Sequence, residues 1–251
     1  MDNKERFSSR VEDYVKYRPS YPAEVLDEIM AQGELVAESA VADIGAGTGI
    51  FSGLLMEQGL RVMAIEPNAD MARAAWAQHG PNDLFGIMLA PAEETGISSH
   101  SMDAVVCAQS FHWFDAEAAR VEFARILKPD KRVFLVWNTR LLSGSPFLEQ
   151  YEELLHRLGT DYGSVNHRNV NGDKLESFFR EGTMTLKTFP NSQLFDFDGV
   201  KGRLLSSSYA PQPGHPKYEQ MLEELRRIFD ETQTDGTVSF DYETELYSGL
   251  V

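Results

Sequence analysis

The feature that most constrains this chain is a cluster of three glycines between two short, mostly apolar segments. Residues 40–44 lead directly into Gly-Ala-Gly-Thr-Gly at 45–49, which predicts a buried strand that breaks into a tight turn. Residues 51–55 have apolar side chains at helical spacing, and 61–65 predict a second buried strand ending in the carboxylate of Glu66. In a parallel sheet, this order places the glycine turn and Glu66 side by side at the carboxyl ends of neighbouring strands, where open α/β sheets bind ligands.

The glycine turn predicts a ligand with an anionic or polar end. Glycine can adopt positive φ and lets a ligand lie against the backbone, while the following helix directs unpaired N–H groups toward it. The phosphate loop of nucleotide hydrolases requires Gly-Lys-Ser/Thr, but here Gly49 is followed by Ile50 and Phe51, so that class is excluded. The dinucleotide fingerprint requires a glycine three positions after Gly47, where this chain has Ile50; a dinucleotide is disfavoured but stays open.

The sequence from Asp43 to Gly49 resembles the glycine motif of class I S-adenosylmethionine-dependent methyltransferases, in the small-molecule group of type 11 and trans-aconitate methyltransferases. The resemblance covers about the first 140 residues well and the remainder loosely. It implies that Glu66 accepts hydrogen bonds from both ribose hydroxyls of S-adenosylmethionine, a role that suits a group with two acceptor oxygens. An ordinary strand-to-helix loop and a solvated acid are the alternatives for these residues.

The resemblance implies an α/β fold with a Rossmann-like seven-stranded, mostly parallel sheet and an antiparallel last strand. Helices cover both faces, and insertions in the C-terminal half form a helical cap over the acceptor pocket. We expect one methyltransferase domain over residues 1–251, since linkers and repeats are absent from the sequence. Its parts are a lid segment and helix at 1–35, a cofactor-binding core at 36–138, cap helices and a strand at 139–235, and a final strand at 236–251.

Composition narrows the class of protein. Apolar residues make up 42% and charged residues 25% of the chain, as in soluble globular proteins. The 23 basic and 39 acidic residues give a formal net charge of −16, which argues against nucleic acid as the substrate. The single Cys107 excludes an intramolecular disulfide and a cysteine metal site, so we expect a reducing cytoplasm and no metal. The sequence shows no secretory signal or membrane-spanning run, and it does not indicate an oligomeric state.

Several helices and strands outside the glycine motif are also predicted. Asn68 is expected to cap a helix in which Met71, Ala72, Ala75 and Trp76 share one face. The apolar run at 132–137 predicts a strand covered on both sides, and residues 178–189 predict a short helix followed by a strand. The period-two alternation at 238–246 predicts a half-exposed final strand.

The segment before the first core helix is rich in tyrosine and is stiffened by Pro19 and Pro22. Tyr14 can shelter a sulfonium by cation–π attraction, and Arg18 can contact a carboxylate. Many small-molecule members of the family carry a similar segment as a lid. An extended stretch packed against the sheet edge is the alternative.

Together with these two, the candidate cofactor-binding residues are Asp43, Gly45, Ala46, Gly47, Gly49, Glu66, Pro67, Met71, Ala92, Glu93, Gln109 and Ser110. In the resemblance, Ala92 and Glu93 belong to the loop that borders adenine, with Glu94 as a rival for the acid. Gln109 and Ser110 follow the fourth strand, where aromatic residues can shield the methyl acceptor from water.

The sequence gives fewer indications of the residues that contact the methyl acceptor. His112 is the candidate catalytic residue, because a histidine can take a proton from an acceptor hydroxyl near neutral pH. A histidine that is hydrogen-bonded in the wall of the site is the alternative. Trp113, Asn138 and Arg140 are the candidate substrate contacts.

These residues favour methyl transfer from S-adenosylmethionine to a small-molecule acceptor by in-line displacement. An oxidoreductase that uses NAD(P) is one alternative, and a non-catalytic module that binds an adenosyl ligand is the other. The sequence does not identify the acceptor.

Overall fold

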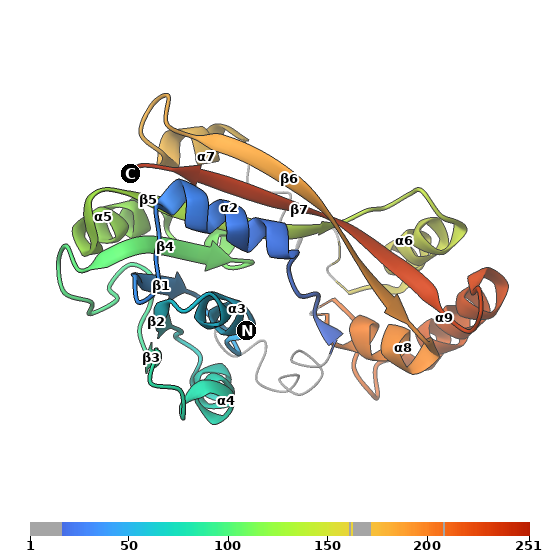
Figure 1. The fold of residues 1–251 in the computed structure, drawn as a ribbon. Coiled ribbons are helices and arrows are strands. Elements are labelled where there is room, and N and C mark those ends of the chain that lie inside the picture. Colours follow the sequence, from blue (N-terminus) through green and yellow to red (C-terminus); the bar gives the residue numbers. More distant parts are fainter. Residues whose placement is uncertain (1–16, 161, 163–171, 208) are drawn as a thin grey trace.

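The computed structural model describes residues 17–160, 162, 172–207 and 209–251, and in this part of the chain one seven-stranded sheet is present (Figure 1). The strand order across the sheet is β3-β2-β1-β4-β5-β7-β6. Strands β1 to β5 are parallel, and β7 runs antiparallel to both of its neighbours. The predicted fold class is confirmed. The strands are β1 (Ala40–Ile44), β2 (Arg61–Ile65), β3 (Phe85–Met88), β4 (Met102–Ala108), β5 (Leu127–Arg140), β6 (Thr185–Phe195) and β7 (Val238–Gly249).

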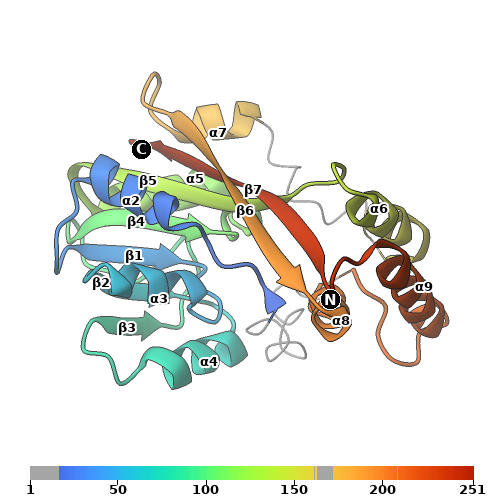
Figure 2. The ribbon, with the colours of Figure 1, turned by 45° about the vertical axis from the view of Figure 1, so that its right-hand side comes forward.

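Helices follow most strands and lie on both faces of the sheet (Figure 2). They are α2 (Ala23–Gly33), α3 (Ile50–Glu57), α4 (Ala69–His79), the short 3-10 helix η3 (Phe111–Trp113), α5 (Ala116–Ile126), α6 (Pro146–Leu158), α7 (Gly172–Phe178), α8 (Phe197–Leu205) and α9 (Tyr218–Thr232). None of the helices in the described part of the chain is long and apolar enough to span a membrane.

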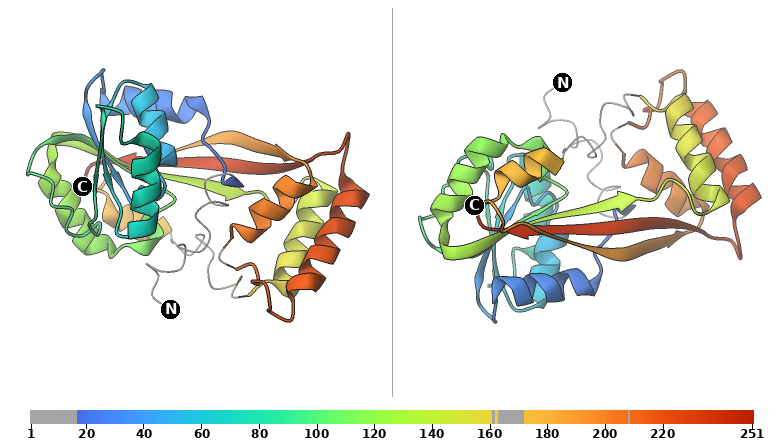
Figure 3. Two further views of the ribbon diagram at one scale, coloured as in Figure 1. Left: turned by 90° about the horizontal axis from the view of Figure 1, so that it is seen from below. Right: turned by 90° about the horizontal axis from the view of Figure 1, so that it is seen from above.

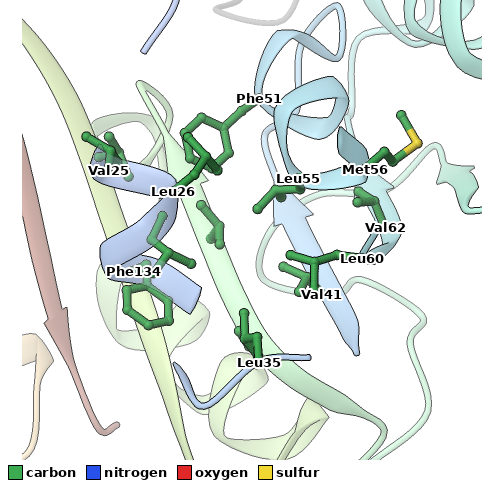
Figure 4. Packing of buried hydrophobic residues seen from close by; sticks show 14 of the residues in the cluster. Val25, Leu26, Leu35, Val41, Phe51, Leu55, Met56, Leu60, Val62 and Phe134 are labelled. Carbon is green, nitrogen blue, oxygen red and sulfur yellow. The ribbon is translucent and has the colours of Figure 1, made fainter. Parts of the chain in front are cut away.

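The two faces of the sheet are buried because successive side chains of a strand point to opposite sides. Val41 and Phe134 lie in one apolar cluster with residues of α2 and α3 (Figure 4). Their neighbours Ala42 and Leu135 lie in a second cluster with residues of α5 and α7. This two-sided burial explains the uninterrupted apolar run in β5.

Strands β5, β6 and β7 extend beyond the parallel layer and carry a separate group of helices, α6, α8 and α9, which we call the C-terminal lobe (Figures 1 and 3). Phe147 and Tyr151 of α6 contact Phe240 of β7 edge to face, at centroid distances of 4.9 and 5.0 Å. Because the lobe is attached where β5 ends, it lies on the carboxyl side of the parallel strands. The glycine turn emerges on the same side.

The helix predicted after Asn68 is present as α4, but its predicted face is only partly covered: Met71 and Ala75 are buried, whereas Trp76 is 54% exposed. Helix α4 lies beside β3, the last strand at this edge of the sheet, so only a narrow face of the helix is covered. One local prediction was wrong. A short helix followed by a strand was expected over 178–189, but α7 ends at Phe178 and β6 begins only at Thr185, after a turn in which Gly182 has φ of 73°.

Because β5 is buried on both faces, a Leu→Ala substitution on β5 should lower the free energy of unfolding far more than the same substitution at an exposed position of β6. Leu135→Ala removes a fully buried side chain and should lower the free energy of unfolding by about 2 to 5 kcal/mol. Leu194→Ala, at a position that is 71% exposed on β6, should change it by less than about 0.5 kcal/mol. Urea unfolding of both variants measures the difference, and equal losses would contradict the described packing.

Candidate functional site

The glycine turn joins the carboxyl ends of β1 and β2. The N–H groups of Gly45 and Ala46 both donate to the carbonyl oxygen of Ile65, at 2.8 and 3.1 Å. Gly45, Gly47 and Gly49 all have positive φ, at 70°, 58° and 83°. The turn is therefore a conformation that favours glycine at all three positions.

Gly45 and Gly47 have different surroundings. A Cβ atom on Gly45 would lie 2.5 Å from Cβ of Ser110, which follows β4 and donates from its hydroxyl to the Ile44 carbonyl at 2.6 Å. Among the described residues, the same atom on Gly47 would meet only the Met71 sulfur, at 3.8 Å. Gly45 thus allows Ser110 to pack directly against the turn. The backbone at Gly47, in contrast, leaves room for another group between it and Met71.

Glu66 is 6% exposed and holds the turn and the next helix together. Its Oε2 accepts the Gly47 N–H and its Oε1 accepts the Asn68 N–H, both at 2.8 Å. Asn68 in turn caps α4 by accepting the N–H of Asp70 and of Met71. Burial raises the pKa of the Glu66 carboxyl, and the two backbone donors offset part of that effect. The predicted residues Gly47, Glu66 and Met71 are thereby brought together, and Pro67 lies between the last two.

A second buried carboxylate lies beneath the turn. Asp43 is 1% exposed and accepts a hydrogen bond of 2.6 Å from the hydroxyl of Ser52 in α3. Burial raises the pKa of Asp43 to about 7, the Ser52 hydrogen bond offsets part of the rise, and the charge of Glu66 adds to it. Ser52 was not predicted, although it lies on the buried face of the helix that follows the glycines.

The loop predicted to border adenine, around Ala92 and Glu93, is held by hydrogen bonds to α5 and its N-cap. Ala92 is buried, and Glu93 accepts the N–H of Asp115 at 2.9 Å, so its carboxylate is directed toward the start of α5. Glu122 accepts both the N–H and the hydroxyl of Thr95, at 2.8 and 2.5 Å. Arg125 donates to the same Glu122 carboxylate, and this hydrogen bond, together with those from Thr95, outweighs burial and lowers the pKa of Glu122 to about 2.

Sequence reasoning missed Glu122. Its only signal is the spacing of an acid three residues before an arginine on one helix.

The segment after β4 packs against the glycine turn through Ser110. Gln109 has a positive φ of 57° and donates from Nε2 to the Asn138 carbonyl at 3.1 Å. The indole N–H of Trp137 points at Nδ1 of His112 at 3.4 Å. If Nδ1 accepts this hydrogen bond, neutral His112 carries its proton on Nε2, so Nε2 is a donor rather than a base. Trp113 is 38% exposed and its ring lies 4.8 Å from that of His112.

The side chain of Asn138 forms hydrogen bonds to three other segments of the chain. Its Nδ2 donates to the Ser20 carbonyl at 3.1 Å, and its Oδ1 accepts from Thr244 at 2.5 Å and from Asn191 at 3.1 Å. The side chain thus ties the segment before α2 to β6 and β7.

Arg140, the last residue of β5, contacts the C-terminal lobe: it pairs with Glu152 of α6, donates to the Tyr162 hydroxyl at 3.1 Å and stacks 5.1 Å from the Tyr151 ring.

Arg18 also contacts the lobe, since its Nη2 donates to the carbonyl of Ser206 at the end of α8, at 3.2 Å. The carbonyl of Arg18 accepts from Gln193 of β6 at 3.4 Å. Tyr14 lies outside the described residues. The predicted residues therefore divide into a group around the glycine turn and a group on the lobe. Within the described residues, no three His, Cys, Asp or Glu side chains gather in a way that could hold a metal ion.

Comparison with known proteins agrees with this fold. A family described as a methyltransferase domain matches residues 42–135. An uncharacterized methyltransferase of Mycobacterium tuberculosis (strain ATCC 25618 / H37Rv) is 42% identical over 137 residues, which are 53% of this chain and 52% of that protein. The match with this relative thus spans about half of its length.

Two solved structures share the fold. A putative type II methyltransferase from Anaeromyxobacter dehalogenans has a TM-score of 0.71 at 21% identity, covering 93% of this chain and 98% of that one. Phosphoethanolamine N-methyltransferase 2 of Haemonchus contortus, solved in complex with S-adenosyl-L-methionine, has a TM-score of 0.56 at 15% identity, covering 99% of this chain and 58% of that one.

The close packing at Gly45 predicts a specific steric cost. Gly45→Ala should lower the free energy of unfolding by the backbone cost of positive φ, about 1 to 2 kcal/mol, plus about 1 to 3 kcal/mol for the overlap with Ser110. Gly144→Ala is the matched control, since Gly144 has φ of 105° with nothing within 4 Å of the added Cβ. Urea unfolding compares the two variants, and an equal loss would show that Ser110 does not restrict this position.

Asp43 predicts a distinct pH dependence. Between the unfolded pKa near 4 and the folded pKa of about 7, the folded state holds a proton that the unfolded state has released, so stability falls as pH rises. The free energy of unfolding of Asp43→Asn, measured relative to that of the unsubstituted protein, should therefore rise by on the order of 3 kcal/mol as the pH rises from 4.5 to 7.5. Urea unfolding at both pH values measures this gain.

Asp103→Asn is the control for this experiment. The pKa of Asp103 is lowered by its Lys128 and Ala40 contacts despite some desolvation, so its stabilising effect is already present at pH 4.5. The cost of that substitution should be nearly the same at both pH values. A pH-independent difference for Asp43→Asn would contradict a buried, protonated carboxyl.

Proposed function

We propose that this chain, whose residues 42–135 match a methyltransferase-domain family, binds S-adenosylmethionine at the glycine turn and transfers the methyl group to a small-molecule acceptor. The observation that carries the proposal is the contact between the Gly47 backbone and the buried carboxylate of Glu66. The complex of the Haemonchus contortus enzyme with S-adenosyl-L-methionine supports the choice of cofactor, because the two folds are alike.

The chemistry of Glu66 fits a ribose diol. Each carboxylate oxygen accepts one backbone N–H and can accept a further hydrogen bond, since each has two lone pairs. The backbone donors hold the carboxylate in place before any ligand arrives. A diol can then use one remaining acceptor on each oxygen.

The turn itself also fits the cofactor. The open side of Gly47 faces the Met71 sulfur, so backbone and an apolar side chain border the same space. The hydroxyl of Thr48 is buried and has no hydrogen-bond partner among the described residues. A buried hydroxyl of this kind costs free energy unless it finds a partner, and the amino-acid part of the cofactor carries groups that can supply one.

The bound cofactor supplies an activated methyl group on a sulfonium, and the chain has to orient the reactants and exclude water. Orientation alone can contribute about 7 to 11 kcal/mol, so a dedicated base is not required. We assign this positioning role to the segment after β4, where Gln109 is fixed through Asn138 and His112 through Trp137.

Calorimetry separates this function from its two alternatives. We expect heat of binding with S-adenosylmethionine and with its demethylated product, and none with NAD or NADP, because Ile50 occupies the position where a dinucleotide turn needs glycine. A screen of small acids, phenols and amines with radiolabelled methyl donor then distinguishes an enzyme from a module that only binds. Folded protein that gives no heat with S-adenosylmethionine at high micromolar concentration would exclude the proposal.

The role of Glu66 predicts a measurable loss of affinity. Glu66→Ala should weaken binding of S-adenosylmethionine by about 1 to 3 kcal/mol, because the ribose hydroxyls lose their acceptor and the turn loses its anchor. Glu57→Ala is the control, since Glu57 is an exposed acid at the end of α3. Calorimetry of both variants measures the effect, and unchanged affinity in Glu66→Ala would place the ribose elsewhere.

A further inference from the structure

Helix α4 lies beside α3 and presents one row of side chains to the glycine turn (Figure 2). Met71, Ala75 and His79 follow one another at intervals of four residues and therefore share one face of the helix. A Cβ atom on Gly47 would lie 3.8 Å from the Met71 sulfur. A Cβ atom on Gly49 would lie 2.8 Å from Cδ2 of His79 and 3.3 Å from Cβ of Ala75. The row thus follows the turn from its middle glycine to its last one.

His79 is the last residue of α4, and its ring lies against the start of α3. Its Nε2 is 3.0 Å from the carbonyl oxygen of Gly49. A Cβ atom on Gly53, one helical turn further along α3, would lie 3.1 Å from Cε1 of the same ring. The ring also contacts Phe85 of β3, at a centroid distance of 5.4 Å. Glycine at positions 49 and 53 therefore lets the imidazole approach the backbone of α3 closely.

The hydrogen bond between His79 and Gly49 has a defined direction. A carbonyl oxygen can only accept, so Nε2 of His79 carries the proton. Burial lowers the pKa of His79, and the hydrogen bond to Gly49 offsets part of that effect. His79 is thus an uncharged donor near neutral pH. The Gly49 carbonyl also accepts the N–H of Gly53 at 2.9 Å, so two donors hold it in place.

Helix α4 is attached to the glycine turn at both of its ends. At its start, Glu66 accepts one N–H from the turn and one from the N-cap of the helix. At its end, His79 donates to Gly49. The 11 residues between these attachments extend about 16 Å. Because the two attachments are far apart, together they fix the direction of α4 along the turn, and with it the position of Met71 beside Gly47.

We propose that His79 is a positioning residue for the cofactor: by holding Gly49, it keeps α4 and the glycine turn in the arrangement that binds S-adenosylmethionine. This inference rests on the proposed function. His79 acts through Gly49 rather than on the ligand, because the room at Gly47 lies beside Met71, about two turns earlier in α4. The two glycines then differ in role. The missing side chain of Gly49 makes room for His79, and that of Gly47 makes room for the cofactor.

A matched pair of substitutions isolates the hydrogen bond. Glutamine places an amide N–H at about the reach of Nε2, whereas methionine has nearly the same length and no donor. Calorimetry with the demethylated product of S-adenosylmethionine measures the affinity of each variant. His79→Met should weaken binding about three- to tenfold, as expected for one lost neutral hydrogen bond, and His79→Gln should stay within about twofold of the unsubstituted protein.

Equal affinities of the two variants would overturn the proposal, whether both are weakened or neither is. If His79→Met does not fold, His79→Leu takes its place, because leucine also lacks a donor.

His100 offers a control of the same kind at another place in the fold. Its Nδ1 lies 3.0 Å from the carbonyl oxygen of Leu127, and it precedes β4, so this contact is at the opposite end of the parallel strands from the glycine turn. His100→Met should lower the Tm as His79→Met does, but it should leave the affinity for the demethylated cofactor within about twofold. A loss of affinity as large as that of His79→Met would show general destabilisation and would overturn the proposal.

Amide hydrogen exchange tests the positioning without any ligand. In His79→Met, the peptide 45–57 should exchange at least about threefold faster than in the unsubstituted protein, whereas the β4 peptide 102–108 should not change. His79→Gln should leave both peptides unchanged. Exchange at 45–57 that does not respond to His79→Met would overturn the proposal.

The two measurements also separate this proposal from the proposed function. Cofactor binding that is insensitive to His79→Met would overturn the His79 proposal alone. An unsubstituted protein that binds neither S-adenosylmethionine nor its demethylated product would overturn the proposed function and, with it, the role of His79 toward the cofactor, even if exchange at 45–57 shows that His79 holds the turn.

Discussion

The buried carboxylate of Glu66 is the interaction on which the shape of the site depends. It accepts one N–H from the glycine turn and one from the segment that begins α4, so it joins two loops that follow different strands. Without it, two backbone donors would lose their partners, at about 1 to 3 kcal/mol each if they stayed buried. The turn is also fastened to β2 through the Ile65 carbonyl, which leaves the glycine backbone little freedom. A ligand at this turn thus meets a preformed surface.

The parts of this site that the sequence revealed are those that depend on neighbouring residues in the chain. A turn with three positive φ angles needs glycine, and a helix that starts after a short strand needs a cap, so residues 45–49 and Asn68 were recognisable from their own context. The mostly parallel sheet with an antiparallel last strand was expected from the resemblance to the methyltransferase family, whereas the order of the strands was not predicted. The roles of the individual site residues stay predictions.

What the sequence could not show is which distant groups satisfy the polar side chains. Asn138 follows an apolar strand, as a ligand contact would, yet its oxygen accepts from Thr244, which is 106 residues away. Arg140 was a candidate substrate contact, but it pairs with Glu152 of α6 and donates to the hydroxyl of Tyr162, which lies 22 residues away. His79 gave no signal at all, because its partner Gly49 lies 30 residues earlier in the chain. Their contact depends on how α3 and α4 pack together.

The order of the last two strands also affects how the protein is made. In the described part of the chain, strand β6 lies at the edge of the sheet and pairs only with β7, although β7 is more than 40 residues further along the chain. On the ribosome, the parallel half of the sheet can assemble as it emerges, whereas β6 has no place to pair until β7 has been synthesised. During that interval, β6 exposes both of its backbone edges to other newly made chains. Pro190, in the middle of β6, offers no N–H to such a partner, and it interrupts the edge at the stage when the chain is most exposed to aggregation.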